Sequence, residues 1–143
     1  MRIRVRRHEN AKREQGQAVI EATLTLMLFL VLVFSLFDFG FSLFLHQTFV
    51  HQARTGARYG AVYAPNDLVA TKNVVLYNKT TGSGKGVMGL APTAVQVTRV
   101  GTAGGPDDRI VVTISGYTFT TITPGWAGKH TGKSITATMP VEN

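Results

Sequence analysis

The sequence contains no cysteine, so no disulfide can stabilise it and cysteine usage gives no information about the redox compartment. Acidic residues are also scarce, because only 8 Asp and Glu accompany 15 Lys and Arg, which gives a formal net charge of +7. The length of 143 residues allows one domain at most. A strongly basic chain of this size suggests a nucleic-acid or membrane partner, and the position of the charges decides between them.

The positive charge is concentrated before residue 17. Residues 1–16 contain two acids, Glu9 and Glu14, and these basic residues: Arg2, Arg4, Arg6, Arg7, Lys12 and Arg13. No basic face interleaved with aromatic residues occurs elsewhere, so we expect no nucleic-acid partner. A basic block directly before an apolar run instead predicts a membrane helix with its N-terminus in the cytoplasm.

The apolar run covers residues 22–45, and Asp38 is the only ionisable residue in it. As a helix, the run would be about 36 Å long, which is enough to cross the roughly 30 Å hydrocarbon core of a bilayer. A buried core helix is the alternative, but the rest of the chain is too small to surround an apolar helix of this length. We therefore expect a single-pass membrane protein.

Residues 1–16 have the features of a basic leader peptide. A secretory signal peptide is disfavoured, because the apolar run is too long and no small-x-small cleavage site follows it. Twin-arginine export has only Arg6 and Arg7 in its favour. The remaining scheme cuts the chain between Gly16 and Gln17, before the apolar run, and leaves the helix on the mature protein.

The helix is expected to continue beyond the membrane, so that residues 17–64 form one element and Pro65 ends it. Small residues in its second half recur at helical spacing, and small residues at i and i+4 allow another helix to approach closely. Two partners stay open for this stripe, a neighbouring helix or the chain's own β-sheet. The stripe consists of Ala53, Gly56, Ala57, Gly60 and Ala61.

Residues 65–143 predict a small extracytoplasmic β-rich head. Strands are predicted where β-branched and aromatic residues alternate, at 94–100, 109–121 and 134–141, with a further short strand at 73–77. A hairpin connection at 101–108 and a Gly-rich loop at 78–93 complete it. The fold class is therefore α+β: a long N-terminal transmembrane helix extending into a small antiparallel β-sheet head.

No constellation in the sequence indicates an enzyme. The G-x-G-x-x-G pattern at 84–89 lacks the chain needed for a nucleotide-binding βαβ unit, and Pro92 follows it closely. His46 and His51 are five residues apart, which is a poor spacing for two zinc ligands on a helix. We predict no catalytic residues, no metal and no cofactor.

The segment Gly16-Gln17-Ala18-Val19-Ile20-Glu21, between the basic leader and the apolar run, resembles the processing site of type IV prepilins. Two further segments resemble one family among the type IV pilin-like proteins, the TadE-like family of tight-adherence pilus systems. These segments are Phe37-Asp38-Phe39-Gly40 and residues 52–58, QARTGAR. The resemblance implies cleavage after Gly16 by a prepilin peptidase. It makes Gln17 the new N-terminus and Glu21 and Asp38 assembly residues.

The resemblance further implies a structural minor pilin or pseudopilin, a homo- or hetero-oligomer with other pilin subunits and the pilus assembly machinery as partners. It would reside in the inner membrane with its head outside, or in an extracellular filament. Glu21 would pair with the new amine of a neighbouring helix or stay solvated among the headgroups. Asp38 would contact a partner subunit or reach the outer headgroups. The alternative function is an uncleaved single-span anchor that presents a β-rich binding domain.

Overall fold

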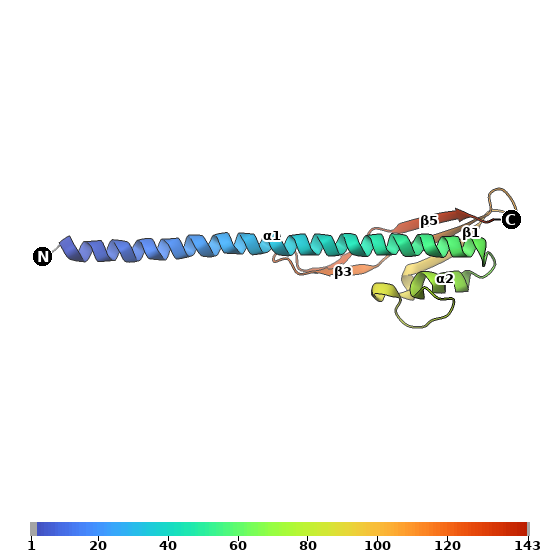
Figure 1. The fold of residues 1–143 in the computed structure, drawn as a ribbon, viewed down its shortest axis with the longest axis horizontal. Coiled ribbons are helices and arrows are strands. Elements are labelled where there is room, and N and C mark those ends of the chain that lie inside the picture. Colours follow the sequence, from blue (N-terminus) through green and yellow to red (C-terminus); the bar gives the residue numbers. More distant parts are fainter. Residues whose placement is uncertain (1–2, 143) are drawn as a thin grey trace.

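A computed structural model describes residues 3–142 of the chain, with side chains from Gly16 onward. One helix, α1 (Ile3–Val62), dominates the molecule with 60 residues, and every other element lies beside its C-terminal half (Figure 1). The helix continues without a break from the residues before Gly16 into the head. This arrangement confirms the α+β class, with a long apolar helix leading into a small antiparallel sheet.

The main sheet has three antiparallel strands in the order β1-β2-β5. They are β1 (Val95–Val100), β2 (Arg109–Ile114) and β5 (Ile135–Pro140), which confirms strands predicted at 94–100 and 134–141 and the hairpin at 101–108. The alternate side chains of β2 that the sequence placed on one face, Ile110, Val112 and Ile114, are fully buried. This face packs on α1, so the sheet and the helix form two layers.

The strand predicted at 73–77 is wrong, because these residues belong to a helix, α2 (Leu68–Tyr77). The side chain of Asp67 caps α2 by accepting a hydrogen bond from the amide of Ala70 at 2.8 Å. The helix buries Thr71 and Val75, one turn apart, against α1. Tertiary packing thus overrides the strand preference of its valines.

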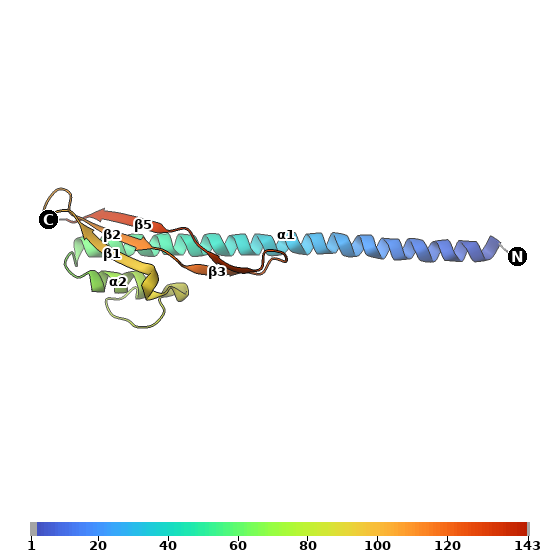
Figure 2. The ribbon, with the colours of Figure 1, turned by 180° about the vertical axis from the view of Figure 1, so that it is seen from behind.

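The long strand predicted at 109–121 is in fact two strands. Strand β2 ends at Ile114, and the chain then turns at Gly116, which adopts a φ of +70°. Strand β3 (Thr118–Thr121) then leaves the main sheet and pairs with β4 (Gly128–Thr131), which the sequence did not predict. This β3–β4 hairpin runs back along α1 towards the N-terminal half, as the view from behind shows (Figure 2).

The hydrophobic core lies between α1, α2 and the main sheet. On α1 it begins at Leu45 and continues through Phe49 and Ala53, one residue per helical turn. The predicted loop at 78–93 contributes Leu90 to it and contains a single-turn helix, Val87–Gly89. Among the described residues, nothing before Leu45 joins this core, so the core of the head lies along only the last third of the long helix.

Candidate functional site

Gly16 lies inside α1 on an exposed part of the helix. A Cβ atom added there would meet no other atom within 4 Å, so packing within the chain does not require a glycine. Glycine in a helix interior costs roughly 1 kcal/mol relative to alanine. Packing around Gly16 therefore gives no reason for a glycine at this position of the helix.

Glu21 lies one helical turn after Gln17, and the two side chains are paired. Gln17 Nε2 donates a hydrogen bond to Glu21 Oε1 at 3.2 Å, and both residues are exposed. The carboxylate therefore stands at the start of the apolar run with a neutral partner from its own chain. A cation brought close to it would find an accessible carboxylate.

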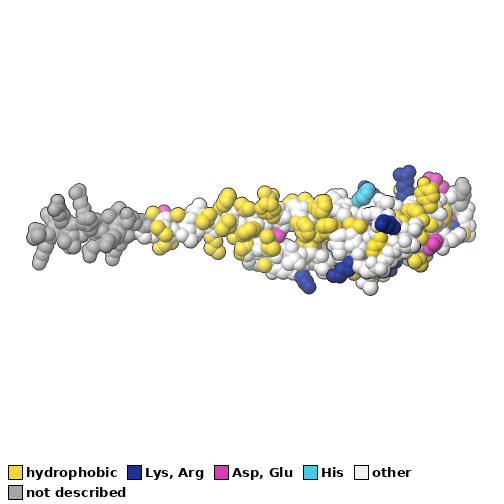
Figure 3. Space-filling model, turned by 60° about the horizontal axis from the view of Figure 1, so that its bottom comes forward, with side chains coloured by type: hydrophobic (Ala, Val, Ile, Leu, Met, Phe, Trp, Pro, Cys, Tyr) yellow, Lys and Arg dark blue, Asp and Glu magenta, His cyan; other side chains and the backbone are white. Residues whose placement is uncertain are grey.

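Most of the apolar part of α1 is exposed. One helical segment, Gly16–Val62, is long and apolar enough to cross a membrane, and none of its most apolar 18-residue window is buried within the chain. Figure 3 shows hydrophobic side chains gathered over this part of the rod. Leu32, Leu36 and Phe37 keep about 70% of their surface exposed (70%, 72% and 68%). Such a surface belongs in lipid or against other helices, and the chain is a candidate single-pass membrane protein.

Asp38 is held by the chain's own hairpin, an arrangement that differs from both sequence interpretations. The backbone amides of Ile122 and Thr123 donate hydrogen bonds to its Oδ2 atom at 2.9 and 2.8 Å. The Thr123 hydroxyl donates to the same oxygen at 2.6 Å. The half-buried carboxylate therefore accepts the donors of the turn between β3 and β4. No sequence signal linked these residues, which are 84 and 85 positions apart.

The small-residue stripe contacts other parts of the same chain. A Cβ atom on Gly56 would lie 2.1 Å from Val75 Cγ2 of α2. A Cβ atom on Gly60 would lie 2.9 Å from Thr71 of α2 and 3.2 Å from Ile110 Cγ2 of β2. The three alanines, Ala53, Ala57 and Ala61, are at most 2% exposed. In the folded subunit the small-residue stripe thus packs against both α2 and the main sheet.

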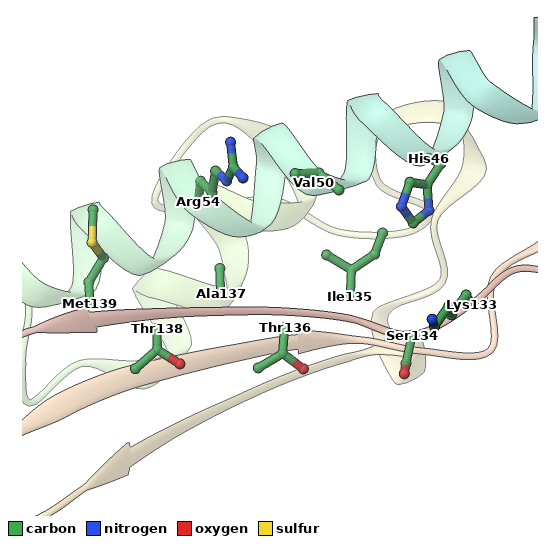
Figure 4. Close-up of a pocket in the computed structure, with 10 residues that line it drawn as sticks. All are labelled: His46, Val50, Arg54, Lys133, Ser134, Ile135, Thr136, Ala137, Thr138 and Met139. Atoms are coloured by element: carbon green, nitrogen blue, oxygen red, sulfur yellow. The ribbon is translucent and has the colours of Figure 1, made fainter.

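A groove separates α1 from β5, one of the two edge strands of the main sheet (Figure 4). Ile135 and Ala137 point from the strand towards the helix, which contributes Val50 and Arg54. His46 closes one end, where its Nδ1 lies 2.8 Å from the Tyr117 hydroxyl. Among the described residues, no group of three His, Asp or Glu side chains could hold a metal ion.

An ion pair that sequence reasoning missed ties the head to the end of α1. Asp108 is 1% exposed and pairs with Arg99, which also donates to the carbonyl of Pro65 at 3.4 Å. The Arg99 guanidinium and the amide of Gly104 hold the pKa of Asp108 down to about 2. The pair joins the β1–β2 connection to the turn after α1, which marks it as structural.

The comparison with known families concerns the part of α1 that contains most of these features. Residues 16–58 match the family model described as TadE-like protein. No curated protein and no solved structure gives a significant match to the chain. The family match begins at Gly16, includes Glu21 and Asp38, and ends within the small-residue stripe. The TadE-like resemblance carried by the sequence motifs is therefore confirmed over residues 16–58.

Proposed function

We propose that the chain is a TadE-like minor pilin or pseudopilin that a prepilin peptidase cuts after Gly16. Its role is structural, in the assembly of a type IV-like, tight-adherence pilus or as a subunit of the filament. The observation that carries the proposal is the apolar helix of residues 16–44, in which no side chain is buried and residues 16–30 are all exposed, within a segment that matches the family. A stably folded head with a long bare apolar helix is suited to sit first in a membrane and then against other helices.

The proposed orientation follows from charge. The basic residues before Gly16 stay in the cytoplasm, and the head lies on the opposite side of the inner membrane. The described residues of the head offer no metal cluster. Partners are expected along the exposed apolar helix, where other pilin subunits and the assembly machinery would contact it.

Cleavage would change the charge at the start of the helix. The new α-amine at Gln17 would be a cation, and Glu21 is an exposed carboxylate that accepts a hydrogen bond from the neutral Gln17 side chain. A carboxylate in an apolar environment requires a partner. In an assembly, the amine of a neighbouring subunit would supply one, which explains why an acid is placed at this position of the helix.

The second candidate function is an uncleaved single-span anchor that presents its small β-rich head. The continuous helix from Ile3 through Gly16 favours this candidate, since no described break exposes the junction. In the first candidate the peptidase must unwind the helix locally, and a glycine lowers the cost of unwinding.

The intact mass of the protein isolated from native membranes or sheared surface fractions tests the choice. A mass equal to residues 17–143, with or without a methyl group, is expected for the proposed function. Gly16→Leu should retain the leader and lose piliation. Gly40→Leu is the matched control, since Gly40 also has free space around its Cβ position, and it should be cut normally. A native mass that includes residues 1–16 would establish the uncleaved anchor.

A further inference from the structure

The tip of the β3–β4 hairpin, residues 122–127, exposes three apolar side chains on one short turn. Ile122 is 61% exposed and Trp126 69% exposed, and Pro124 between them is also exposed. A soluble domain rarely presents an isoleucine, a proline and a tryptophan on one short turn without a partner. The proposed pilin role does not by itself account for this turn.

The hairpin places this tip beside the apolar part of α1 (Figure 2). Trp126 and Phe119 line one groove with Phe39 of α1. Pro124 lines a second groove, further towards the N-terminus, with Val31 and Phe34. The apolar surface of the tip is therefore continuous with that of the helix. Exposed apolar side chains of α1 also lie before and after Asp38 along the helix, such as Leu36 and Phe41.

The depth of the tip follows from helix geometry. Asp38 lies 21 residues after Gln17, which is about 31 Å along a helix and matches the roughly 30 Å thickness of a hydrocarbon core. With Gln17 at the inner boundary, Asp38 and the turn that it holds come to lie at the outer boundary. Tryptophan is enriched at this depth, where its ring contacts lipid and its N–H reaches water.

Several polar groups of the turn are internally paired, which lowers the cost of contact with lipid. Asp38 accepts from the amides of Ile122 and Thr123, and the Trp126 amide donates to the Thr123 carbonyl at 3.0 Å. The Trp126 carbonyl accepts from the Thr121 hydroxyl at 2.6 Å. His130 Nε2 lies 3.2 Å from the same carbonyl. A turn exposed only to water would not need this set of partners.

The charges around the tip suit lipid headgroups. Residues 118–133 contain no Asp or Glu, and their charged side chains are the exposed Lys129 and Lys133. Lys129 lies three residues after Trp126, so its long side chain can extend from the tip towards phosphate groups. An apolar tip followed closely by Lys129 fits the boundary between acyl chains and phosphates better than it fits bulk water.

We propose that the hairpin tip is a second membrane contact of this subunit, inserted into the outer interface of the same bilayer that α1 crosses. Ile122, Pro124 and Trp126 lie among the upper acyl chains, and Asp38 fixes their depth by holding the turn against the helix. The head is thereby held at a defined height and rotation on the membrane. This contact does not depend on cleavage after Gly16, because it requires only that α1 spans the bilayer.

Trp126 is the only tryptophan of the chain, so its fluorescence reports the tip directly. We would reconstitute the full chain at low protein-to-lipid ratio into phosphatidylcholine–phosphatidylglycerol vesicles, with iodide on both sides. Emission shifted to short wavelength, strong quenching by lipids brominated near the headgroup end of the acyl chains, and several-fold weaker quenching by iodide than in the control are expected. The control is Trp126→Phe combined with Tyr63→Trp, since Tyr63 is 77% exposed beyond the end of α1.

Two results would overturn the proposal. Trp126 could be quenched by iodide as strongly as the reporter at position 63 and remain unquenched by brominated lipid, which would place the tip in water. Alternatively, Trp126 could become protected only at high protein-to-lipid ratio, which would identify a second copy of the chain as the partner of the tip. Neither result would bear on cleavage after Gly16, which the intact mass decides separately.

Discussion

The two halves of α1 have opposite compositions and opposite surroundings. From Gly16 to Phe44 no side chain is buried, although this half contains the long run of Leu, Phe and Val. From Leu45 to Ala61 a stripe is buried in every turn, although this half contains Gln52, two glycines and several alanines. The less hydrophobic half of the helix thus forms the core of the protein.

The difference teaches that side-chain size, as well as hydrophobicity, decides what a helix face can pack against. Large apolar side chains cover a helix that meets lipid, which adapts to any shape. Small side chains allow α2 and β2 to approach the backbone of α1 closely, and the neighbours then fill the space. Gly40 and Gly56 illustrate this difference between the two halves. A side chain of α2 occupies the position of the absent Cβ atom at Gly56, whereas the space at Gly40 is free.

The largest expected effect comes from filling that space. In Gly56→Leu the new Cβ atom would overlap Val75 Cγ2, so α2 must separate from α1. We expect a loss of about 3 kcal/mol of head stability, seen as faster hydrogen exchange of β2 amides in the reconstituted protein. Gly40→Leu is the control in the other half, and leucine's better helix propensity should leave the head unchanged. Equal effects of the two substitutions would contradict the division of α1 into two halves.

A second prediction concerns the ion pair between Arg99 and the buried Asp108 in the head. Asp108→Asn should lower the melting temperature of the head by several degrees, because it leaves Arg99 without its counter-charge. Asp107→Asn is the matched control, since the neighbouring Asp107 side chain is 85% exposed and lies 3.7 Å from Arg109. It should be close to neutral.

The pH dependence of the same pair has a definite sign. The pKa of Asp108 falls from the usual 3.8 to about 2 in the folded protein, because Arg99 and the Gly104 amide favour the carboxylate. Its stabilising contribution is therefore complete above pH 3.8 and is lost as the pH falls through about 2. Thermal melts between pH 5 and pH 2 should show this loss in the parent chain and not in Asp108→Asn. A parallel decline in both would assign the acid sensitivity to another group.

Local patterns in the sequence predicted the long helix, the strands β1, β2 and β5, and the alternation that buries Ile110, Val112 and Ile114. They failed where tertiary contacts decide. The valines of α2 favour a strand, yet Thr71 and Val75 at helical spacing fill the spaces beside Gly60 and Gly56. Strand β4, GKHT, lacks the apolar alternation that signals a strand, and its pairing with β3 forms it.

For the candidate site, too, sequence reasoning found the residues that follow a local pattern and missed those brought together by the fold. Gly16, Gln17, Glu21 and Asp38 were identified because their spacing along one helix resembles a family motif. The partner of Asp38 was missed because the turn at Ile122 and Thr123 is distant in sequence and lacks a charged residue. A carboxylate that binds backbone amides leaves no complementary side chain for sequence reasoning to detect.

The third prediction tests the contact that crosses between the two halves. Asp38→Ala should release the hairpin from α1, because the amides of Ile122 and Thr123 lose their acceptor. Their hydrogen exchange in reconstituted protein should accelerate at least about tenfold, while β2 amides remain protected. Ser35→Ala is the control, since Ser35 lines the same groove but donates its hydrogen bond to Val31 of its own helix. Unchanged exchange in Asp38→Ala would show that other contacts hold the hairpin.

The smallest expected effect is at the boundary between the halves, where His46 of α1 lies against Tyr117. Tyr117→Phe keeps the edge-to-face contact with Phe49, whose ring centroid is 4.8 Å away, and removes only the hydroxyl bonded to His46. We expect a loss of about 1 kcal/mol in the unfolding free energy of the head, measured by chemical denaturation in detergent. Tyr59→Phe, at a half-buried ring near Tyr63, is the control and should cost less.

Measuring the unfolding free energy of the head at alkaline pH distinguishes the contribution of the Tyr117 hydroxyl from that of its ring. Burial raises the pKa of Tyr117 above its usual 10.0. Tyrosine in the unfolded chain then ionises first, so this contribution to stability is complete below pH 10.0 and declines as the pH rises towards the folded pKa. Tyr117→Phe should remove that part of the decline. If both proteins lose stability equally above pH 10.0, the Tyr117 hydroxyl is open to solvent and the head is looser at the boundary of the two halves than the packing around Phe49 indicates.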